Sequence, residues 1–369
     1  MKKAIAFDLG NVVFGFDYKV ALEKIKDKIK VSYEKIIEDL FLNDFATDFE
    51  KGLISVYDFY LKFKNTYSAS LTYEEFKDTW SKIFFPRQEI VSLIEKLRIV
   101  YSVYLISNIN ELHFQYLYHT YPYIFSLFDN LILSFKLKAV KPEKKIYEEL
   151  KKISCQEYKD IIYIDDRQDL IREAQKLNLN CIKFTDYKQF IKDLTSLSIT
   201  FPDEEEKNIL LFLKEKISFY KNSLLLGLGN ILRGDDGVGV KIVQNLKDKI
   251  CLRTLNVENA IENYLDKIKK TNPDFLLIID AGDFSKKSRF WLFSSKEIKD
   301  SALYFTHNTS LELTLQYLQK KKNFDILILG IKAKNCFFGE DLGKSTQEAK
   351  VLIESFFLKN FPLIVKCAS

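Results

Sequence analysis

Polar residues in the first half of the sequence could together transfer a phosphoryl group. Asp8 ends the apolar run AIAF, Ser107 and Asn108 follow VYLI, Lys141 precedes a helical pattern, and Asp165 and Asp166 follow IIYI. A carboxylate can act as a nucleophile, a hydroxyl and an amide can hold phosphate oxygens, a lysine can balance charge, and paired acids can bind Mg²⁺. The set therefore predicts phosphoryl-transfer chemistry.

A second candidate site lies in the stretch LGLGNILRGDDGVGV, residues 226–240. A glycine-rich turn between a strand and a helix usually indicates a phosphate site, but Asp235 and Asp236 would repel a phosphate. Leu232 also occupies the position of the third glycine that a dinucleotide site needs. The two acids could instead cap the helix at its positive end or bind a cation.

Two further residues could join Asp236 around a metal ion. Asp280 ends the apolar run FLLII, and His307, in YFTHNTS, is the single histidine of the second half. Two carboxylates and an imidazole suit a divalent transition metal such as nickel or zinc. Each residue alone also has an ordinary explanation, as a helix cap, a turn residue or a loop hydrogen-bonding group.

Helical and strand patterns alternate along most of the chain, which predicts α/β folding with ligands at the carboxyl ends of the strands. A long helical stretch, from about residue 18 to 84, interrupts the first half and predicts a separate cap, about 15–86. Serines, a proline and an acidic run near residue 200 predict a linker, after which the alternation restarts. We therefore expect domains at 1–199 and 222–369, joined by a linker at 200–221.

Composition excludes several classes of protein. The net charge is +5 over 369 residues with lysines spread along the chain, which argues against nucleic-acid binding. No apolar run could span a bilayer, and Asp8 and Gly10 interrupt the start too early for a signal peptide. Five cysteines form no CxxC pair, which argues against zinc or iron–sulfur sites and favours a reduced cytoplasm.

The motifs FDLGNVV, LISN, KPE and YIDD resemble, in order and spacing, the haloacid dehalogenase-like (HAD-like) hydrolases of the sugar-phosphatase-like branch, over roughly residues 1–199. The resemblance implies a Rossmann-like fold with a helical cap and a Mg²⁺-dependent phosphatase acting on a small phosphorylated metabolite. It implies the following roles: Asp8 as the nucleophile, Ser107 and Asn108 as phosphate ligands, Lys141 as the orienting lysine, and Asp8, Asp165, Asp166 and the Gly10 carbonyl as Mg²⁺ ligands.

Two departures from that resemblance affect the chemistry. Gly10 occupies the position where many of these phosphatases carry a general acid, and Asp17 is the nearest substitute. Lys138 and Val140 replace the glycine and the basic residue that precede KPE in the family. A degenerate domain that serves as a scaffold or binding module is therefore the alternative to an active phosphatase.

The second half is similar to the [NiFe] hydrogenase maturation proteases, through GNILRGDDGVG, DAGD and THN, over about residues 222–360. The resemblance implies a smaller phosphorylase/hydrolase-like α/β sandwich and an aspartic-type endopeptidase without a metal of its own. Asp236, Asp280 and His307 would contact nickel already inserted in a hydrogenase large-subunit precursor, whose C-terminal extension is removed. The loop 257–260 reads VENA where the family often has a glycine-rich turn.

The sequence thus predicts a phosphatase-like domain fused to a hydrogenase maturation endopeptidase. The alternatives are an assembly chaperone that binds the immature large subunit without cutting it, and a metal-dependent hydrolase with a resident metal. As-purified metal content would separate the last of these from the others.

Overall fold

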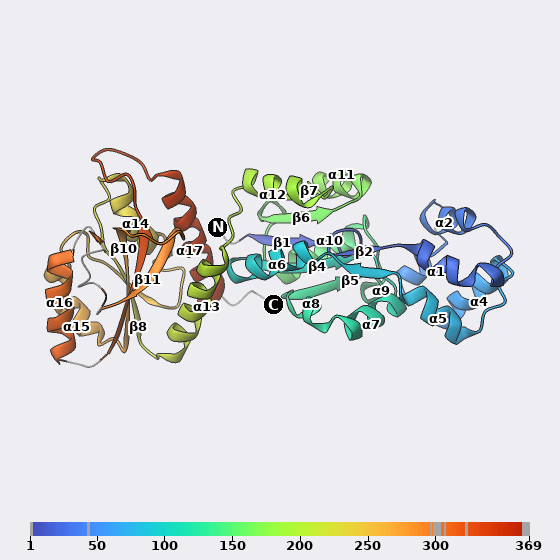
Figure 1. Ribbon diagram of the computed structural model, residues 1–369, viewed down its shortest axis with the longest axis horizontal. Helices are drawn as coiled ribbons and strands as arrows, with labels where there is room; N and C mark the ends of the chain where they lie inside the picture. Colours follow the sequence, from blue (N-terminus) through green and yellow to red (C-terminus); the bar gives the residue numbers. More distant parts are fainter. Residues whose placement is uncertain are drawn as a thin grey trace. The chain divides into compact units, whose positions relative to one another are not determined.

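The computed structural model describes residues 3–42, 45–295, 297, 304–305, 308–321 and 324–363. The chain divides into two compact units, Met1–Ile199 and Thr200–Ser369, and both are α/β (Figure 1). This confirms the predicted fold class. None of the helices in the described ranges is both long enough and apolar enough to cross a membrane.

The first unit is built on a parallel sheet in the order β5-β4-β1-β6-β7. The strands are β1 (Ala4–Phe7), β4 (Ser102–Ser107), β5 (Asn130–Leu133), β6 (Ile161–Asp165) and β7 (Asn180–Lys183). β1 is apolar at every position and buried throughout, as expected of a central parallel strand covered on both faces. Phe7 pairs in register with Leu105 of β4 and with Ile164 of β6. The residues that follow these three strands therefore meet at one edge.

Helices cover this sheet and connect its strands. They are α6 (Gln88–Val100), α7 (Glu111–Thr120), α8 (Pro122–Ser126), α9 (Ser134–Leu137), α10 (Lys144–Ser154), α11 (Gln168–Lys176) and α12 (Tyr187–Ser196), with the 3₁₀ turn η2 (Tyr158–Asp160). In α10 the buried side chains are Ile146, Tyr147 and Leu150, three to four residues apart, which places one apolar face of the helix on the sheet.

The predicted cap contains several short helices rather than one long one. It holds α1 (Tyr18–Ile25), η1 (Lys26–Lys28), α2 (Tyr33–Leu42), α3 (Thr47–Glu50), α4 (Val56–Thr66) and α5 (Tyr73–Ser81). Two antiparallel strands, β2 (Phe14–Phe16) and β3 (Phe84–Pro86), lie where the chain enters and leaves it. Capping boxes at Ser55 and Thr72 start α4 and α5, and aromatic rings such as Phe49 and Phe59, with centroids 4.3 Å apart, form its core.

The second unit has a mixed sheet in the order β11-β13-β10-β8-β9, with β12 also paired to β10. Its strands are β8 (Ser223–Gly227), β9 (Arg253–Asn256), β10 (Phe275–Asp283), β11 (Phe290–Ser294), β12 (Tyr304–Phe305) and β13 (Asp325–Lys332). β11 and β12 are antiparallel to their neighbours, whereas β9, β8, β10 and β13 run parallel. The carboxyl ends of the parallel strands again share one edge.

Helices lie on both faces of this second sheet (Figure 1). They are α13 (Glu204–Phe219), η3 (Gly234–Gly237), α14 (Val238–Leu246), η4 (Ile261–Tyr264), α15 (Leu265–Thr271), α16 (Asn308–Lys321) and α17 (Lys344–Asn360). Ile268 of α15 and Leu311 and Leu315 of α16 pack on apolar side chains of the sheet, while α14 contacts α17.

The stretch predicted as a linker, 200–221, is largely helical. Asp203 caps α13 with a complete capping box, and Glu206 is fully buried. The guanidinium of Arg289 donates to both oxygens of Glu206, at 2.9 and 2.6 Å. The apolar and acidic residues of this stretch therefore form a helix that belongs to the second unit, and only residues 200–203 and 220–221 of the stretch lie outside it.

Candidate active sites

The first site centres on a buried lysine between two carboxylates. Lys141 Nζ donates to Asp8 Oδ1 at 2.6 Å and to Asp165 Oδ2 at 2.7 Å. All three side chains are buried, because Asp8 and Asp165 follow or end the central strands β1 and β6. Tyr163 also donates its hydroxyl to Asp165, and Arg167 donates its backbone N–H to the other oxygen at 2.9 Å. Asp165 is therefore fixed in place by several donors.

Two asparagines position the other members of this site. Asn11 has a left-handed backbone, with φ of 55°, and donates to Asp166 Oδ2 at 3.0 Å. Asn108 accepts from the Lys141 backbone N–H at 2.7 Å and donates to the Lys141 carbonyl at 3.1 Å. The Asn108 amide, expected to bind phosphate, thus holds the loop that carries Lys141. The role of Asn11 was not predicted from the sequence, although its place in the DLGNV motif pointed to the site.

Three carboxylates here could hold one cation. Ligand oxygens of Asp8, Asp165 and Asp166 lie within 4.8 Å of one another. Gly10 adjoins them, since a Cβ there would lie 3.8 Å from Asp8 Oδ2. An all-oxygen donor set of this kind suits Mg²⁺. Ser107, at the end of β4, is also buried at the same edge of the sheet.

The electrostatics of the cluster follow from its burial. Burial raises the pKa of Asp8 to about 7; Lys141 opposes the shift, and the charge of Asp165 adds to it. Burial likewise raises the pKa of Asp166. Burial disfavours the Lys141 ammonium, but the charges of Asp165 and Asp8 outweigh it and raise the lysine pKa. Three acids face one lysine, so a cation would relieve the excess of negative charge.

Asp17, considered as a substitute acid, has another role. It is exposed and its carboxylate accepts from the Lys19 backbone N–H at 2.8 Å, which caps α1. Lys138 adopts a left-handed backbone, with φ of 57°, at the position where the family has glycine, and donates to the carbonyl of Gly52 in the cap. The substituted lysine therefore ties the cap to the core.

In the second unit, a glycine shapes the turn after β8. Gly229 has φ of 134°, and a Cβ there would lie 1.9 Å from the carbonyl oxygen of Asp236. Its N–H donates to the carbonyl of Glu258 at 2.8 Å, in the loop that reads VENA. The close approach brings the start of η3 against the end of the sheet, and η3 contacts β10.

The adjacent aspartates of η3 have different roles. Asp235 is almost fully buried and accepts three backbone N–H groups, from Lys334 and Asn335 at 2.9 Å and from Gly343 at 2.7 Å. It fixes the loop between β13 and α17. The sequence did not reveal this structural role.

Asp236 is buried but only partly hydrogen-bonded. Its Oδ2 accepts from the Asn230 N–H at 3.2 Å, whereas Oδ1 has no hydrogen-bond partner among the described residues. Asp280 lies fully buried on β10, opposite Gly330 of β13, and its Oδ1 accepts from the Ala281 N–H at 2.8 Å. His307, the third predicted metal contact, lies outside the described residues.

A cysteine lies near these aspartates. Burial raises the pKa of the Cys336 thiol, and the charges of Asp236 and Asp235 raise it further. The thiol therefore stays protonated at neutral pH and is a poor nucleophile.

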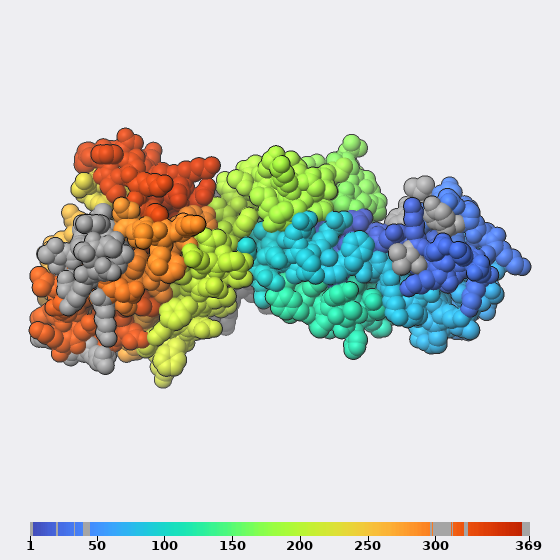
Figure 2. Space-filling model, in the orientation of Figure 1, coloured from blue at the N-terminus to red at the C-terminus, as the bar shows by residue number. Residues whose placement is uncertain are grey.

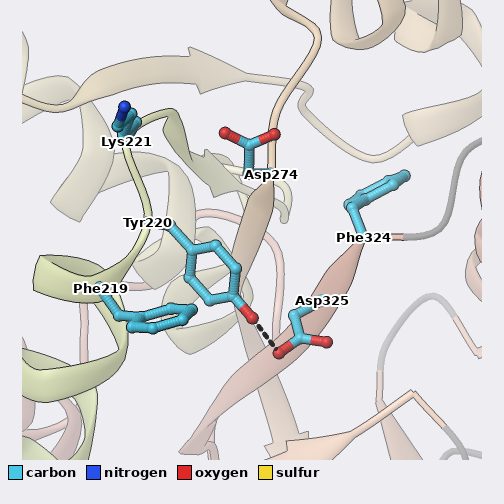
Figure 3. A pocket seen from close by; sticks show the side chains of 6 residues that line it. All are labelled: Phe219, Tyr220, Lys221, Asp274, Phe324 and Asp325. Atoms are coloured by element: carbon cyan, nitrogen blue, oxygen red, sulfur yellow. Dashed lines mark hydrogen bonds between the residues drawn. The ribbon is translucent and has the colours of Figure 1, made fainter.

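A pocket of about 410 Å³ opens at the opposite, amino edge of the second sheet (Figure 3). It is lined by Phe219, Tyr220, Lys221, Asp274, Phe324 and Asp325. Asp325 already accepts from the Tyr220 hydroxyl and from Lys216 Nζ. No predicted site residue lines this pocket, and its edge of the sheet is not where such folds bind ligands.

Comparison with known proteins identifies the family of the chain. A curated protein of Methanocaldococcus jannaschii, named as a putative hydrogenase maturation protease, is 32% identical over 136 residues, which cover 33% of this chain and 78% of that protein. This chain belongs to the hydrogenase maturation protease family. No protein-family model matches it.

Solved structures are similar to parts of this chain. A HAD family enzyme of Bacteroides thetaiotaomicron, in complex with magnesium and inorganic phosphate, is 24% identical and covers 52% of this chain and 99% of its own, with a TM-score of 0.46. The [NiFe] hydrogenase maturation protease HycI of Thermococcus kodakarensis is 24% identical and covers 40% of this chain and 99% of its own, with a TM-score of 0.36.

Proposed function

We propose that the chain is an endopeptidase that removes the C-terminal extension of a nickel-loaded [NiFe] hydrogenase large-subunit precursor. The supporting observation is Asp236, a buried carboxylate with one oxygen lacking a hydrogen-bond partner among the described residues. A buried acid in this state is costly unless a cation or donor completes its surroundings. Membership of the hydrogenase maturation protease family makes the nickel of the substrate the fitting cation.

In this proposal the metal is part of the substrate and marks a precursor as ready to be cut. Asp236, Asp280 and His307 contact the nickel and so place the adjacent peptide bond in the site. A water molecule adds to the peptide carbonyl, the C–N bond breaks, and the leaving amine takes a proton. Binding energy that depends on the nickel would restrict cleavage to loaded precursor.

The test is to incubate the protein with nickel-loaded and nickel-free precursor and follow the precursor's mass. We expect a mass loss with the loaded form alone, abolished by His307→Ala. Tight binding without mass loss would instead support an assembly chaperone. A stoichiometric metal resident in the second unit as purified would support a generic metal-dependent hydrolase.

For the first unit we propose Mg²⁺-dependent hydrolysis of a small phosphate ester. The Asp8–Lys141–Asp165 arrangement supports this activity, because it places a nucleophilic carboxylate beside a buried ammonium. Asp8 would attack phosphorus and form an aspartyl-phosphate as the ester oxygen departs, and water would then hydrolyse the acyl phosphate. Lys141 and Ser107 would hold the phosphoryl oxygens. Asp8, Asp165, Asp166 and the Gly10 carbonyl would hold Mg²⁺, which supplies positive charge against the phosphate.

A phosphate-ester screen with Asp8→Asn tests this second activity. We expect hydrolysis that requires Mg²⁺ and falls at least about 1,000-fold in the variant, since an amide cannot attack phosphorus. Asp169→Asn is the matched control, because Asp169 is paired with Arg167 outside the cluster. Activity that survives in Asp8→Asn would refute the role, and no hydrolysis of any ester by the wild type would favour a scaffold or binding domain.

A further inference from the structure

Four exposed apolar side chains lie on two loops at the carboxyl edge of the second sheet. Ile231 and Leu232, which follow β8, are 47% and 56% exposed, and Phe337 and Phe338, which follow β13, are 73% and 76% exposed. We call these four residues the apolar rim. A single exposed apolar residue is ordinary, but several on adjoining loops indicate an interaction surface.

One backbone hydrogen bond and one side-chain hydrogen bond hold the two loops of the rim together. The N–H of Gly339 donates to the carbonyl of Leu232 at 2.8 Å, and Arg233 Nε donates to the carbonyl of Cys336 at 3.2 Å. The loop that follows β13 stands on the surface of the second unit, in red in Figure 2. The rim is therefore one continuous feature, although its members are about a hundred residues apart in the sequence.

One of these two loops leads into η3, which carries Asp236 of the candidate nickel site, and the other is held against η3. Asp235 accepts backbone N–H groups of Lys334, Asn335 and Gly343, and Asp236 is the next residue along η3. The position of the rim is thus fixed relative to the Asp236 carboxylate. The rim also adjoins η3 directly, because a Cβ on Gly237 would lie 2.6 Å from the Cα of Ile231.

We infer that the apolar rim binds an extended apolar stretch of the precursor polypeptide that flanks the cleaved bond. This inference rests on the proposed peptidase function. The carboxylates can bind the nickel, but the precursor polypeptide around the cleaved bond needs contacts of its own. Burying two exposed phenylalanines against apolar side chains supplies them. The rim adjoins the η3 turn that carries Asp236, so we take a substrate segment, rather than a second copy of this chain, as its occupant.

The rim is tested with the full-length double variant Phe337→Ser/Phe338→Ser and nickel-loaded precursor as the probe. We expect KM for precursor cleavage to rise roughly 30-fold or more, as for loss of aromatic anchors at an interface, with kcat within about twofold. Phe219→Ser is the matched control, since this phenylalanine is 79% exposed at the opposite edge, and should leave KM unchanged.

The outcomes separate the rim from the proposed function itself. If the wild type leaves nickel-loaded precursor uncut, the peptidase function fails and the rim loses its substrate. If the wild type cuts and the double variant keeps the same KM, the inference about the rim alone is wrong. If the wild type sediments as a dimer and the double variant as a monomer, with KM unchanged, the rim is a self-association surface.

Discussion

Two adjacent residues of one motif, Asp235 and Asp236, have different roles. Asp235 accepts three backbone N–H groups and so closes a loop that starts about a hundred residues later. Asp236 is equally buried but keeps one oxygen without a hydrogen-bond partner among the described residues. The first carboxylate therefore belongs to the fold, whereas the second is available for a ligand.

This difference in hydrogen bonding predicts different effects of the two amide substitutions on stability. Asp235→Asn should lower the stability of the second unit by roughly 2 kcal/mol or more, because an amide offers one acceptor oxygen to three donors and loses the charge. Asp236→Asn should leave stability within about 0.5 kcal/mol or raise it, since it removes a buried charge. Denaturant unfolding of both variants checks this, with precursor cleavage as the second readout. Equal losses of stability would contradict the assignment.

The sequence singled out Asp236 as a metal contact but gave no sign of what Asp235 does in the fold. The DD pair and the strand-to-helix turn were visible, and so was the nearby end of an apolar strand at Asp280. The donors to Asp235 come from a loop whose own sequence, KNCFFGEDLG, shows no sign of that partner. Long-range backbone contacts leave no local pattern, and for the same reason the link between Asn108 and Lys141 was not foreseen.

A buried histidine in the first unit should make its stability depend on pH. His113 Nε2–H donates to the carbonyl of Trp80 and Nδ1 accepts from the Asn110 amide, both at 3.0 Å, as the neutral ring allows. A proton on Nδ1 would face the NH₂ of Asn110, whose oxygen already caps α7 through the His113 N–H. Burial lowers the pKa of His113 from 6.5 to about 4.

The sign of the effect follows from the lowered pKa. Between pH 6.5 and about 4, His113 binds a proton in the unfolded chain but not in the folded chain. The free energy of unfolding that is present above pH 6.5 is therefore reduced by up to about 3 kcal/mol as the pH falls. Urea unfolding followed by Trp80 fluorescence, in a Trp291→Phe background, measures it. His113→Gln should be less stable at neutral pH but lose less between pH 6.5 and 4.5. Parallel losses in both proteins would assign the effect elsewhere.

At the scale of elements, the strand ends determine where both sites form. Alternating patterns were sufficient to place the parallel strands of both sheets, because buried parallel strands are short apolar runs between helices. The two-residue strand β12, which pairs with β10, was expected to be a loop. The patterns were not sufficient for the cap, where the helices α1, α2, α3, α4 and α5 are short and separated by turns without strong breakers. The range 200–221 was predicted as a linker although its segment ILLFLKEKISFYK has a helix-like pattern, because the acidic run before that segment, which includes the buried Glu206, is typical of a solvated stretch.

The anchor of α13 should matter more than a surface ion pair. Arg289 donates to Glu206 from two guanidinium nitrogens and from its backbone N–H, and to the carbonyl of Phe201. Arg289→Met would leave the fully buried carboxylate with few donors, and we expect a loss of about 3–5 kcal/mol in the second unit. The double variant Glu206→Gln/Arg289→Met should recover part of it. Denaturant unfolding gives both values; a loss below about 1 kcal/mol would mean the pair is dispensable.

At the scale of the whole molecule, the division into units predicts where proteases cut. The sequence predicts an accessible stretch of more than twenty residues. The helix α13 removes most of it, and only residues 197–203 lack regular helix between α12 and α13. Thermolysin should therefore cleave first within 197–203, next to Leu197, Ile199 or Phe201, because backbone outside a regular helix can enter a protease cleft more easily than α12 or α13 can. Mass spectrometry of a timed digest should show two complementary fragments whose boundary lies near residue 200, while the peptide bonds within α13 stay uncut. Asp8→Asn should not change the position of the cut, since the cluster around Lys141 lies within the first unit. A first cut inside 204–219 would show that α13 is not held by the second unit, and an undivided chain after long digestion would show that residues 197–203 are protected.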